Sequence, residues 1–352
     1  MKTNVTMEVK RSCQAVAFSI FPSAGKSRSF REGTTKKLIL SLLILSLVSI
    51  VSGGAREASA QDDPISPQAT VLKVPRDYAT IQTAVNAAIT GDTIKVAAGV
   101  YNENVVISTS GLRLQGSEDA VIDGTGLTGS GIQVIGTAAQ PLADVEVSGF
   151  EVRGFQRGIV LQLTTGARIS GNDVHDNNKS PAPANLDQAT GIDLVTAKSS
   201  DVSENVVHNN GFAGIQLRVG STNNVVHDNN IFENGALLTT DMSGRGVLVT
   251  GAGTNDNEIR SNKILRNSGR GIMIGRPVGT VPITGNLVLK NKVHENQRCG
   301  VCIMGAAQDN VVLKNDATGN NLSGLAPCLT FNLFDESPVD NIWRKNQGTS
   351  NF

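Results

Sequence analysis

Residues 201–217, DVSENVVHNNGFAGIQL, contain the pattern that decides the fold. Asn205 and Asn210 in this stretch stand five residues apart, and a pair with this spacing recurs along the second half of the chain. The first member appears as Asn172, Asn205, Asn229, Asn262, Asn291, Asn315 and Asn346. The second member follows as Asn177, Asn210, Asn234, Asn267, Asn296, Asn320 and Asn351. A fixed offset in seven pairs out of seven identifies an internal repeat.

A second unit, a glycine followed by alternating apolar residues, recurs in step with the asparagines. It occupies residues 131–134, 158–161, 191–194, 214–217, 246–249, 271–274 and 300–303. Alternation with a period of two, rich in β-branched residues, predicts strands. The tightest spacing of the unit is 23 residues, from Gly191 to Gly214. A period of this size built from short strands predicts a parallel β-solenoid whose coils stack to bury their apolar faces.

The asparagines are predicted to form two structural ladders inside this stack. Equivalent residues of successive coils lie about 4.8 Å apart, so each amide can bond to the amides above and below it. Phe150 and Phe155 take the two ladder positions one coil earlier and are expected to end the ladders. This interpretation removes most of the asparagines from the functional candidates.

Both ends of a solenoid expose unpaired strands and therefore need a cap. Ile81, Ala84, Val85 and Ala88 recur at helical spacing and predict a helix over the first coil. Large apolar side chains gather near the other end, at Phe331, Phe334 and Trp343.

The N-terminal part predicts export. A basic leader runs into the uncharged, apolar residues 38–51, which are too few for a comfortable membrane span, and the small-residue motif Ala58-Ser59-Ala60 follows. We expect residues 1–60 to be a signal peptide cleaved after Ala60, residues 61–70 a linker, and residues 71–352 the repeat domain. The protein is then secreted or periplasmic and has no membrane segment after cleavage.

The charge balance excludes general nucleic-acid binding. After Ala60 the chain has 22 basic and 28 acidic residues, a net charge of −6. Binding along nucleic acid needs excess positive potential to replace the counterions of the phosphates. We expect a monomer.

With these features the chain resembles the right-handed parallel β-helix repeat family, the pectin-lyase-like superfamily that includes carbohydrate-binding and sugar-hydrolase domains and NosD-like periplasmic proteins. The resemblance covers Val71 to Phe352, and its motifs are the repeat and residues 99–103, GVYNE, of the form G-x-Y-x-E. It implies an all-β, single-stranded right-handed parallel β-helix of roughly nine to ten coils with an N-terminal capping helix. It also implies secretion and contact with polysaccharide.

The catalytic signatures of the superfamily's best-known enzymes are missing. The pectin methylesterase motif L-G-R-P-W is echoed only by Ile274-Gly275-Arg276-Pro277, with Val278 in place of the tryptophan. The N-T-D, G-H-G and R-I-K motifs of polygalacturonases and one R-x-P-x-x-R pectate lyase motif do not occur.

Two long insertions point to a candidate site. Residues 179–190 and 236–245 enter the glycine-containing sheet from the same corner, so a groove is expected beside them. Arginines there can clamp uronate carboxylates, and acidic residues can bind Ca²⁺ through oxygen. The predicted catalytic residues are Arg245, Arg270, Arg218 and Asp193, and the predicted Ca²⁺-binding residues are Asp187 and Asp241. The alternative is a solvated turn with surface ion pairs.

The histidines and cysteines can likewise be structural residues or ligands of a metal ion. His175, His208 and His294 share one outward position and are interpreted as surface residues, with metal binding or a base as the alternative. In an oxidising compartment Cys328 can pair with Cys299 or Cys302 and leave an odd thiol. Zinc binding would need a fourth ligand.

Three functions are therefore compared. The first is an exported protein that binds an acidic or neutral polysaccharide in a groove on the glycine-containing sheet. The second is a lyase or epimerase that acts on a uronate polymer with Arg and Ca²⁺. The third is a non-catalytic structural or periplasmic maturation protein of the NosD-like kind.

Overall fold

The computed structural model describes residues 68–178, 189–235, 244–275, 282–324, 328, 330–336 and 340–352. The predicted signal peptide and residues 61–67 of the predicted linker lie outside this part. Within the described residues, no helix combines the length and the apolar composition that a membrane crossing requires.

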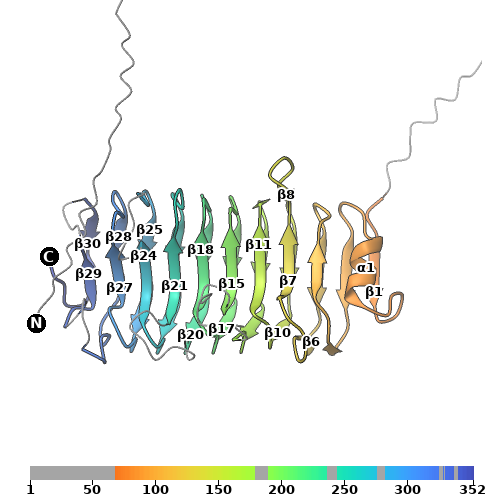
Figure 1. Ribbon diagram of the computed structural model, residues 1–352, viewed down its shortest axis with the longest axis horizontal. Helices are drawn as coiled ribbons and strands as arrows, with labels where there is room; N and C mark the ends of the chain where they lie inside the picture. The colour runs from red at the N-terminus through yellow and green to blue at the C-terminus, as the bar shows by residue number, and fades with distance from the viewer. Residues whose placement is uncertain are drawn as a thin grey trace, which may run out of the picture. The chain divides into compact units, whose positions relative to one another are not determined.

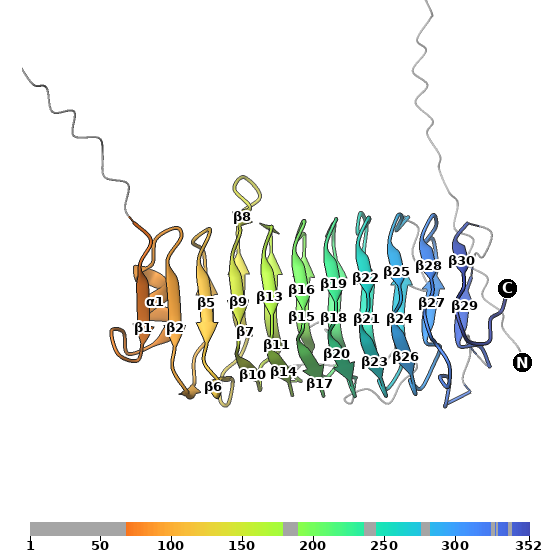
Figure 2. The same ribbon diagram turned by 180° about the vertical axis from the view of Figure 1, so that it is seen from behind.

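The described chain is a parallel β-helix built from three long sheets (Figures 1 and 2). Sheet A holds β1 (Val71–Val74), β2 (Thr93–Val96), β5 (Arg113–Gly116), β9 (Glu146–Ser148), β13 (Arg168–Ser170), β16 (Asp201–Ser203), β19 (Val225–His227), β22 (Glu258–Arg260), β25 (Leu287–Leu289), β28 (Val311–Leu313) and β30 (Ile342–Arg344). Sheet B holds β3 (Gly99–Tyr101), β6 (Ala120–Asp123), β10 (Glu151–Arg153), β14 (Asp173–His175), β17 (Val206–His208), β20 (Asn230–Phe232), β23 (Lys263–Leu265) and β26 (Lys292–His294). Sheet C holds β4 (Val105–Ile107), β7 (Ser130–Ile135), β11 (Arg157–Gln162), β15 (Thr190–Val195), β18 (Ala213–Arg218), β21 (Arg245–Thr250), β24 (Arg270–Gly275), β27 (Val301–Met304) and β29 (Leu333–Asp335). The short strands β8 (Leu142–Ala143) and β12 (Thr164–Thr165) pair with each other.

Each coil visits sheets A, B and C in this order, and the strands pair in parallel with the coils before and after. The nine strands of sheet C agree with the predicted nine to ten coils. The right-handed parallel β-helix expected from the repeat is confirmed. Its core is the stack of inward side chains, such as Ile192, Ile215 and Val247, which are fully buried in register.

The predicted asparagine ladders are present and buried. The backbone N–H and Nδ2 of Asn205 both donate to Oδ1 of Asn229, at 3.0 Å each. Nδ2 of Asn205 also donates to the carbonyl of Ile169, 2.9 Å away. The backbone N–H groups of Phe150 and Phe155 donate to Oδ1 of Asn172 and Asn177, respectively. These buried phenylalanines therefore end the two ladders on their N-terminal side, as expected.

The structure differs from the predicted ladders in two respects: Asn351 is not part of the second ladder, and a third asparagine ladder is present. Asn351 does not continue the second ladder, because Asn320 N–H donates to Asn332 and the amide of Asn351 bonds to Asp335. The chain leaves the regular coil between these residues. A third ladder, which the repeat analysis missed, lies at the corner that leads into sheet A. Its members each stand five residues before a first-ladder residue: Asn224, Asn257, Asn286, Asn310 and Asn341.

The second ladder explains the repeated glycine of sheet C. A Cβ on Gly191 would lie 2.7 Å from Nδ2 of Asn210 and 2.7 Å from Cγ1 of Val207. Real Cβ atoms do not approach other atoms so closely, so only glycine fits where the strand passes over the ladder.

The predicted N-terminal cap is also confirmed. Helix α1 (Ile81–Ala87) covers the first coil (Figure 1) and buries Ile81, Ala84 and Val85. Thr80 caps it with a reciprocal capping box to Thr83. The carboxylate of Glu103 accepts the backbone N–H groups of Ile81 and Gln82, each at 2.9 Å. The last residue of the G-x-Y-x-E motif therefore holds the cap in place.

Candidate functional site

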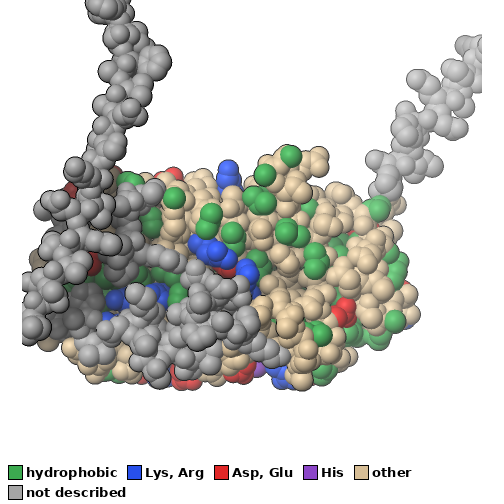
Figure 3. Space-filling model, in the orientation of Figure 1, with side chains coloured by type: hydrophobic (Ala, Val, Ile, Leu, Met, Phe, Trp, Pro, Cys, Tyr) green, Lys and Arg blue, Asp and Glu red, His purple; other side chains and the backbone are tan. Residues whose placement is uncertain are grey.

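The outer face of sheet C carries a buried carboxylate held by two arginines. Asp193 is fully buried, and Arg218 makes a bidentate contact with it, with Nε and Nη2 at 3.0 and 2.9 Å. Nη1 of Arg157, on the preceding coil, lies 3.3 Å from the same carboxylate. Basic side chains gather over β15 and β18 in the space-filling view (Figure 3). A bidentate Arg–carboxylate pair fixes the position of both groups.

The four predicted catalytic residues fall into two groups. Arg218 is the Cα partner of Thr250, five residues after Arg245 on the neighbouring strand. At about 3.3 Å per residue, Arg218 lies roughly 16 Å from Arg245 along the strand direction, whereas Asp193, which is in register with Leu248, lies roughly 10 Å away. Arg245 and Arg270 are Cα partners of each other and are almost completely buried. Asp187 and Asp241, the predicted Ca²⁺ ligands, lie outside the described residues.

Arg245 packs against an aromatic ring and a thioether. Its guanidinium carbon lies 4.9 Å from the centroid of the Phe212 ring, and its Nε lies 3.3 Å from Sδ of Met273. A cation over an aromatic face is stabilised by the ring quadrupole.

Next to these arginines, sulfur atoms gather on the outer face of sheet C. We call the group formed by Cys299, Cys302, Cys328, Met273 and Met304 the sulfur cluster. All five are buried in one apolar cluster, separate from the interior core. The three Sγ atoms lie within 4.8 Å of one another, and Sγ of Cys299 is at bonding distance from the other two. Because one sulfur forms one disulfide, the oxidised cluster keeps one free thiol, in line with the predicted odd thiol.

Part of the sulfur cluster could have been predicted from the sequence, because the strand alternation places Met273 and Cys302 on the same face of sheet C. Met273 and Cys302 stand at the same outward parity of successive coils and are Cα partners in the structure. Cys328 comes from the following coil, where the repeat is irregular. The sequence left open whether Cys328 pairs with Cys299 or Cys302, and the structure places it beside Cys299.

An open groove of about 640 Å³ lies on another face, over β9, β13, β16 and β19 of sheet A. Its charged lining residues are Asp144, Glu146, Arg168, Asp201, Glu204 and His227. Burial disfavours the charged form of His227, but hydrogen bonds to Asp228 and Asp201 outweigh this effect and raise the pKa of the imidazole above its ordinary value.

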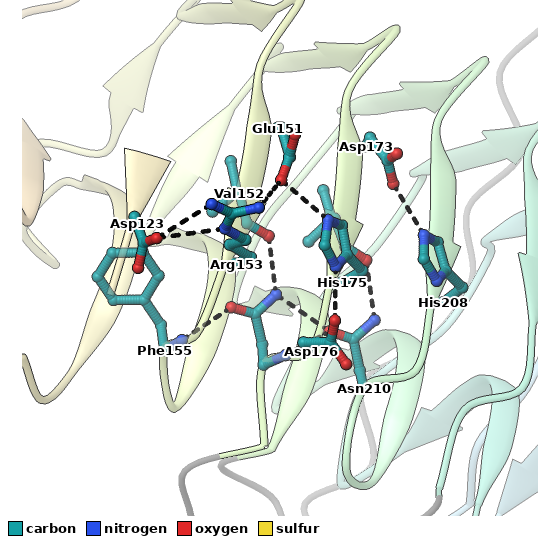
Figure 4. A network of polar contacts seen from close by, with 12 residues as sticks. Asp123, Glu151, Val152, Arg153, Phe155, Asp173, His175, Asp176, His208 and Asn210 are labelled. Atoms are coloured by element: carbon teal, nitrogen blue, oxygen red, sulfur yellow. Dashed lines mark hydrogen bonds and ion pairs between the residues drawn. The ribbon is translucent and has the colours of Figure 1, made fainter. Parts of the chain in front are cut away.

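On the outer face of sheet B, His175 and His208 are Cα partners, as their shared outward position predicted (Figure 4). Their rings stack with centroids 4.7 Å apart and planes at 9°. Phe232 continues the stack at 4.8 Å from His208. Figure 4 shows His175 between the carboxylates of Glu151 and Asp176, while His208 faces Asp173.

Comparisons with known proteins agree with this architecture. A family model described as "Periplasmic copper-binding protein (NosD)" matches residues 85–325. The comparison with curated protein sequences finds no match.

Solved structures share the fold at low sequence identity. A complex of XylC with xylose is 12% identical, with a TM-score of 0.56, over 79% of this chain and 67% of that one. ORF18 of Geobacillus virus E2 is 13% identical, with a TM-score of 0.51, over 76% of this chain and 61% of that one. At such identities the likeness establishes the fold alone.

Proposed function

Since the chain belongs to the NosD family of periplasmic copper-binding proteins, whose model spans residues 85–325, we propose that it is an exported protein that binds Cu(I) through its sulfur cluster. The observation that carries this proposal is the convergence of Cys299, Cys302 and Cys328, whose Sγ atoms lie within 4.8 Å of one another. A non-catalytic role, as in the third function considered from the sequence, fits this site best.

The donor set fits Cu(I). Thiolate and thioether sulfurs are soft ligands and select Cu(I), whereas a structural zinc site takes four nitrogen or thiolate ligands. Met273 and Met304 add two thioethers to the three thiols of the same buried cluster. Low coordination by soft ligands in a water-excluded site is the chemistry that holds copper in its reduced state. Copper binding then requires the thiols to be reduced, because a disulfide sulfur is a poor ligand.

The proposal is tested by titrating the reduced protein with Cu(I) against a chromophoric Cu(I) chelator under anaerobic conditions. We expect one tightly held Cu(I) per chain. Cys328→Ser should weaken binding by at least about 100-fold, since even the loss of an outer-shell partner costs 10- to 100-fold. Met273→Leu, which keeps the volume and removes the sulfur, should also weaken it.

The control is Leu248→Val, which removes one methylene from the same apolar cluster and no sulfur. Its Cu(I) affinity should equal that of the unaltered protein. An affinity that falls as much in Leu248→Val as in Cys328→Ser would mean that packing, and not sulfur ligation, governs the result. Absence of stoichiometric Cu(I) binding by the reduced protein would reject the proposal.

Binding of an acidic polysaccharide is the second candidate, supported by a separate observation on sheet C. Arg157 and Arg218 flank Asp193, and both arginine side chains are about one fifth exposed. Nε2 of Gln216, on the strand next to Asp193, is buried and has no hydrogen-bond partner among the described residues. Arginine side chains at the surface of a sheet suit a carboxylate-bearing ligand.

A panel of uronate and neutral glycans tests this candidate. Binding of a uronate polymer that is lost in Arg157→Gln and kept in Arg113→Gln, a surface arginine on sheet A, would support it. Release of unsaturated uronate products, measured with and without Ca²⁺, would extend it to a lyase. Failure to bind any glycan of the panel would exclude both functions and leave the copper proposal unaffected.

A further inference from the structure

We propose that Asp173, His175 and His208 form a binding site for a borderline divalent transition-metal ion of the Zn²⁺ and Cu²⁺ class on the outer face of sheet B (Figure 4). This site lies on a different sheet from the sulfur cluster and uses nitrogen and oxygen ligands. It therefore goes beyond the proposed function and does not rest on it.

The register of the coils brings the ligands together. Asp173 and His175 project from β14, and His208 is the Cα partner of His175 on β17. One ring nitrogen of each histidine and one carboxylate oxygen lie within 4.8 Å of one another. Two nitrogens bound to one Zn²⁺ are at most about 4.2 Å apart, because each Zn–N bond is about 2.1 Å. Because the nitrogen lone pairs lie in the planes of the stacked rings, both rings turn toward each other when they bind a shared ion.

His175 lies between two carboxylates. Its Nδ1 lies 2.8 Å from Oδ2 of Asp176, and its Nε2 lies 3.3 Å from Oε1 of Glu151, an oxygen that also accepts from Nη1 of Arg153 at 2.7 Å. A carboxylate behind the ligating imidazole is also the usual outer shell of metal-bound histidines.

His208 lies one coil later and also turns its Nε2 toward a carboxylate. Its Nε2 lies 3.2 Å from Oδ1 of Asp173. Its Nδ1 is buried and has no hydrogen-bond partner in the described part of the chain. The polar side of the ring is therefore its Nε2 side, which faces the carboxylates. The two side chains are 14% and 19% exposed, so an ion can reach them from solvent.

Acidic side chains outnumber basic ones in the ion pairs around the two histidines. Asp123, Glu151, Asp173 and Asp176 are acids, and Arg153 is the base among them (Figure 4). This excess of negative charge attracts a dication.

Cu²⁺ is the probe for the test, because it binds nitrogen and oxygen sites more tightly than other first-row divalent ions. We expect one equivalent of Cu²⁺ whose electron paramagnetic resonance spectrum shows coupling to two imidazole nitrogens. Cu(I) gives no such spectrum, so the sulfur cluster does not contribute to the signal. The same titration in the combined Cys299→Ser, Cys302→Ser and Cys328→Ser variant prevents thiols from reducing the probe, and it should give the same spectrum.

His208→Phe is the decisive variant, because Phe232 already occupies the next position of this ring stack and shows that a phenyl ring fits there. It should weaken Cu²⁺ binding by at least about 100-fold with an unchanged unfolding midpoint. Asp176→Asn should weaken it by 10- to 100-fold through the outer shell. The matched control is His294→Phe, in the same column of sheet B. Nε2 of His294 lies 3.0 Å from Oδ2 of Asp316, and the residue is not part of the proposed site.

Three outcomes would overturn the proposal. They are the absence of stoichiometric Cu²⁺ binding, retention of the two-imidazole signal in His208→Phe, and an equal loss of the signal in His294→Phe. Each is independent of whether the sulfur cluster binds Cu(I), so the two proposals fail separately.

Discussion

At the scale of single residues, asparagine holds the coils together because it is short and carries both a donor and an acceptor. In Asn229, Oδ1 accepts from the backbone N–H and the side chain of Asn205, and Nδ2 donates to Asn262 and to the carbonyl of Val202. Buried turn amides without partners cost roughly 1–3 kcal/mol each. The ladder satisfies them with the same residue in every coil.

Replacing one rung tests this account. Asn229→Ala should lower the free energy of unfolding by about 2–4 kcal/mol, because it leaves buried donors of Asn205 without an acceptor. Urea denaturation followed by circular dichroism measures the change. Asn230→Ala, at the next position and outside the ladders, should change it by no more than about 0.5 kcal/mol. Equal losses in both variants would contradict the ladder account.

At the scale of elements, the capping helix depends on a residue from the next coil. Helix α1 has seven residues, too few to be stable alone, and no acidic residue in its first turn. Glu103 supplies the missing negative charge at its N-terminus. The G-x-Y-x-E motif thus has a structural role in this chain.

Glu103→Ala should therefore lower the free energy of unfolding by about 1–2 kcal/mol, the usual cost of losing an N-terminal cap. The measurement is again urea denaturation. Glu118→Ala, at an exposed position between β5 and β6 near the N-terminal end of the β-helix, is the control and should have an effect near zero. If Glu103→Ala leaves the free energy of unfolding unchanged, packing alone holds the capping helix in place.

At the scale of the whole molecule, the three sheets present three different outer chemistries. Sheet A carries an acidic groove, sheet B a stacked histidine pair, and sheet C the Asp193–Arg218 pair beside the sulfur cluster. Because each coil contacts only its neighbours, a site on one sheet can change without disturbing the others.

Nearest-neighbour stacking also predicts that the C-terminal coil unfolds first. Its strand β30 pairs on one side only, and Ile342 is 46% exposed. Trp343, the single tryptophan of the chain, lies in β30 and donates to Oδ2 of Asp335 at 2.7 Å. We expect tryptophan fluorescence to change at lower urea than circular dichroism does. Coincident transitions would instead indicate one cooperative unit.

The sequence by itself determined the coil, its period, two of the three ladders and the capping helix. Each of these depends on local periodicity that repeats in every coil, so a fixed spacing of Asn and Gly contains the information. The third ladder was visible in the same spacing, five residues before the first. The rung assigned to Asn351 was wrong because the last coil breaks the period.

Only the tertiary structure decided which side chains meet on the outer faces. The sequence identified Asp193, Arg218, Arg245 and Arg270 as candidates, and the register between strands pairs the first two and places Arg245 beside Arg270 near the other end of their strands. The shared outward position of His175 and His208 already predicted that they lie in one column, whereas their ring stacking and the place of Cys328 beside Cys299 were decided by the structure. Spacing along the chain predicts which outward positions share a column, but the contacts between the side chains follow from the stacking of distant coils.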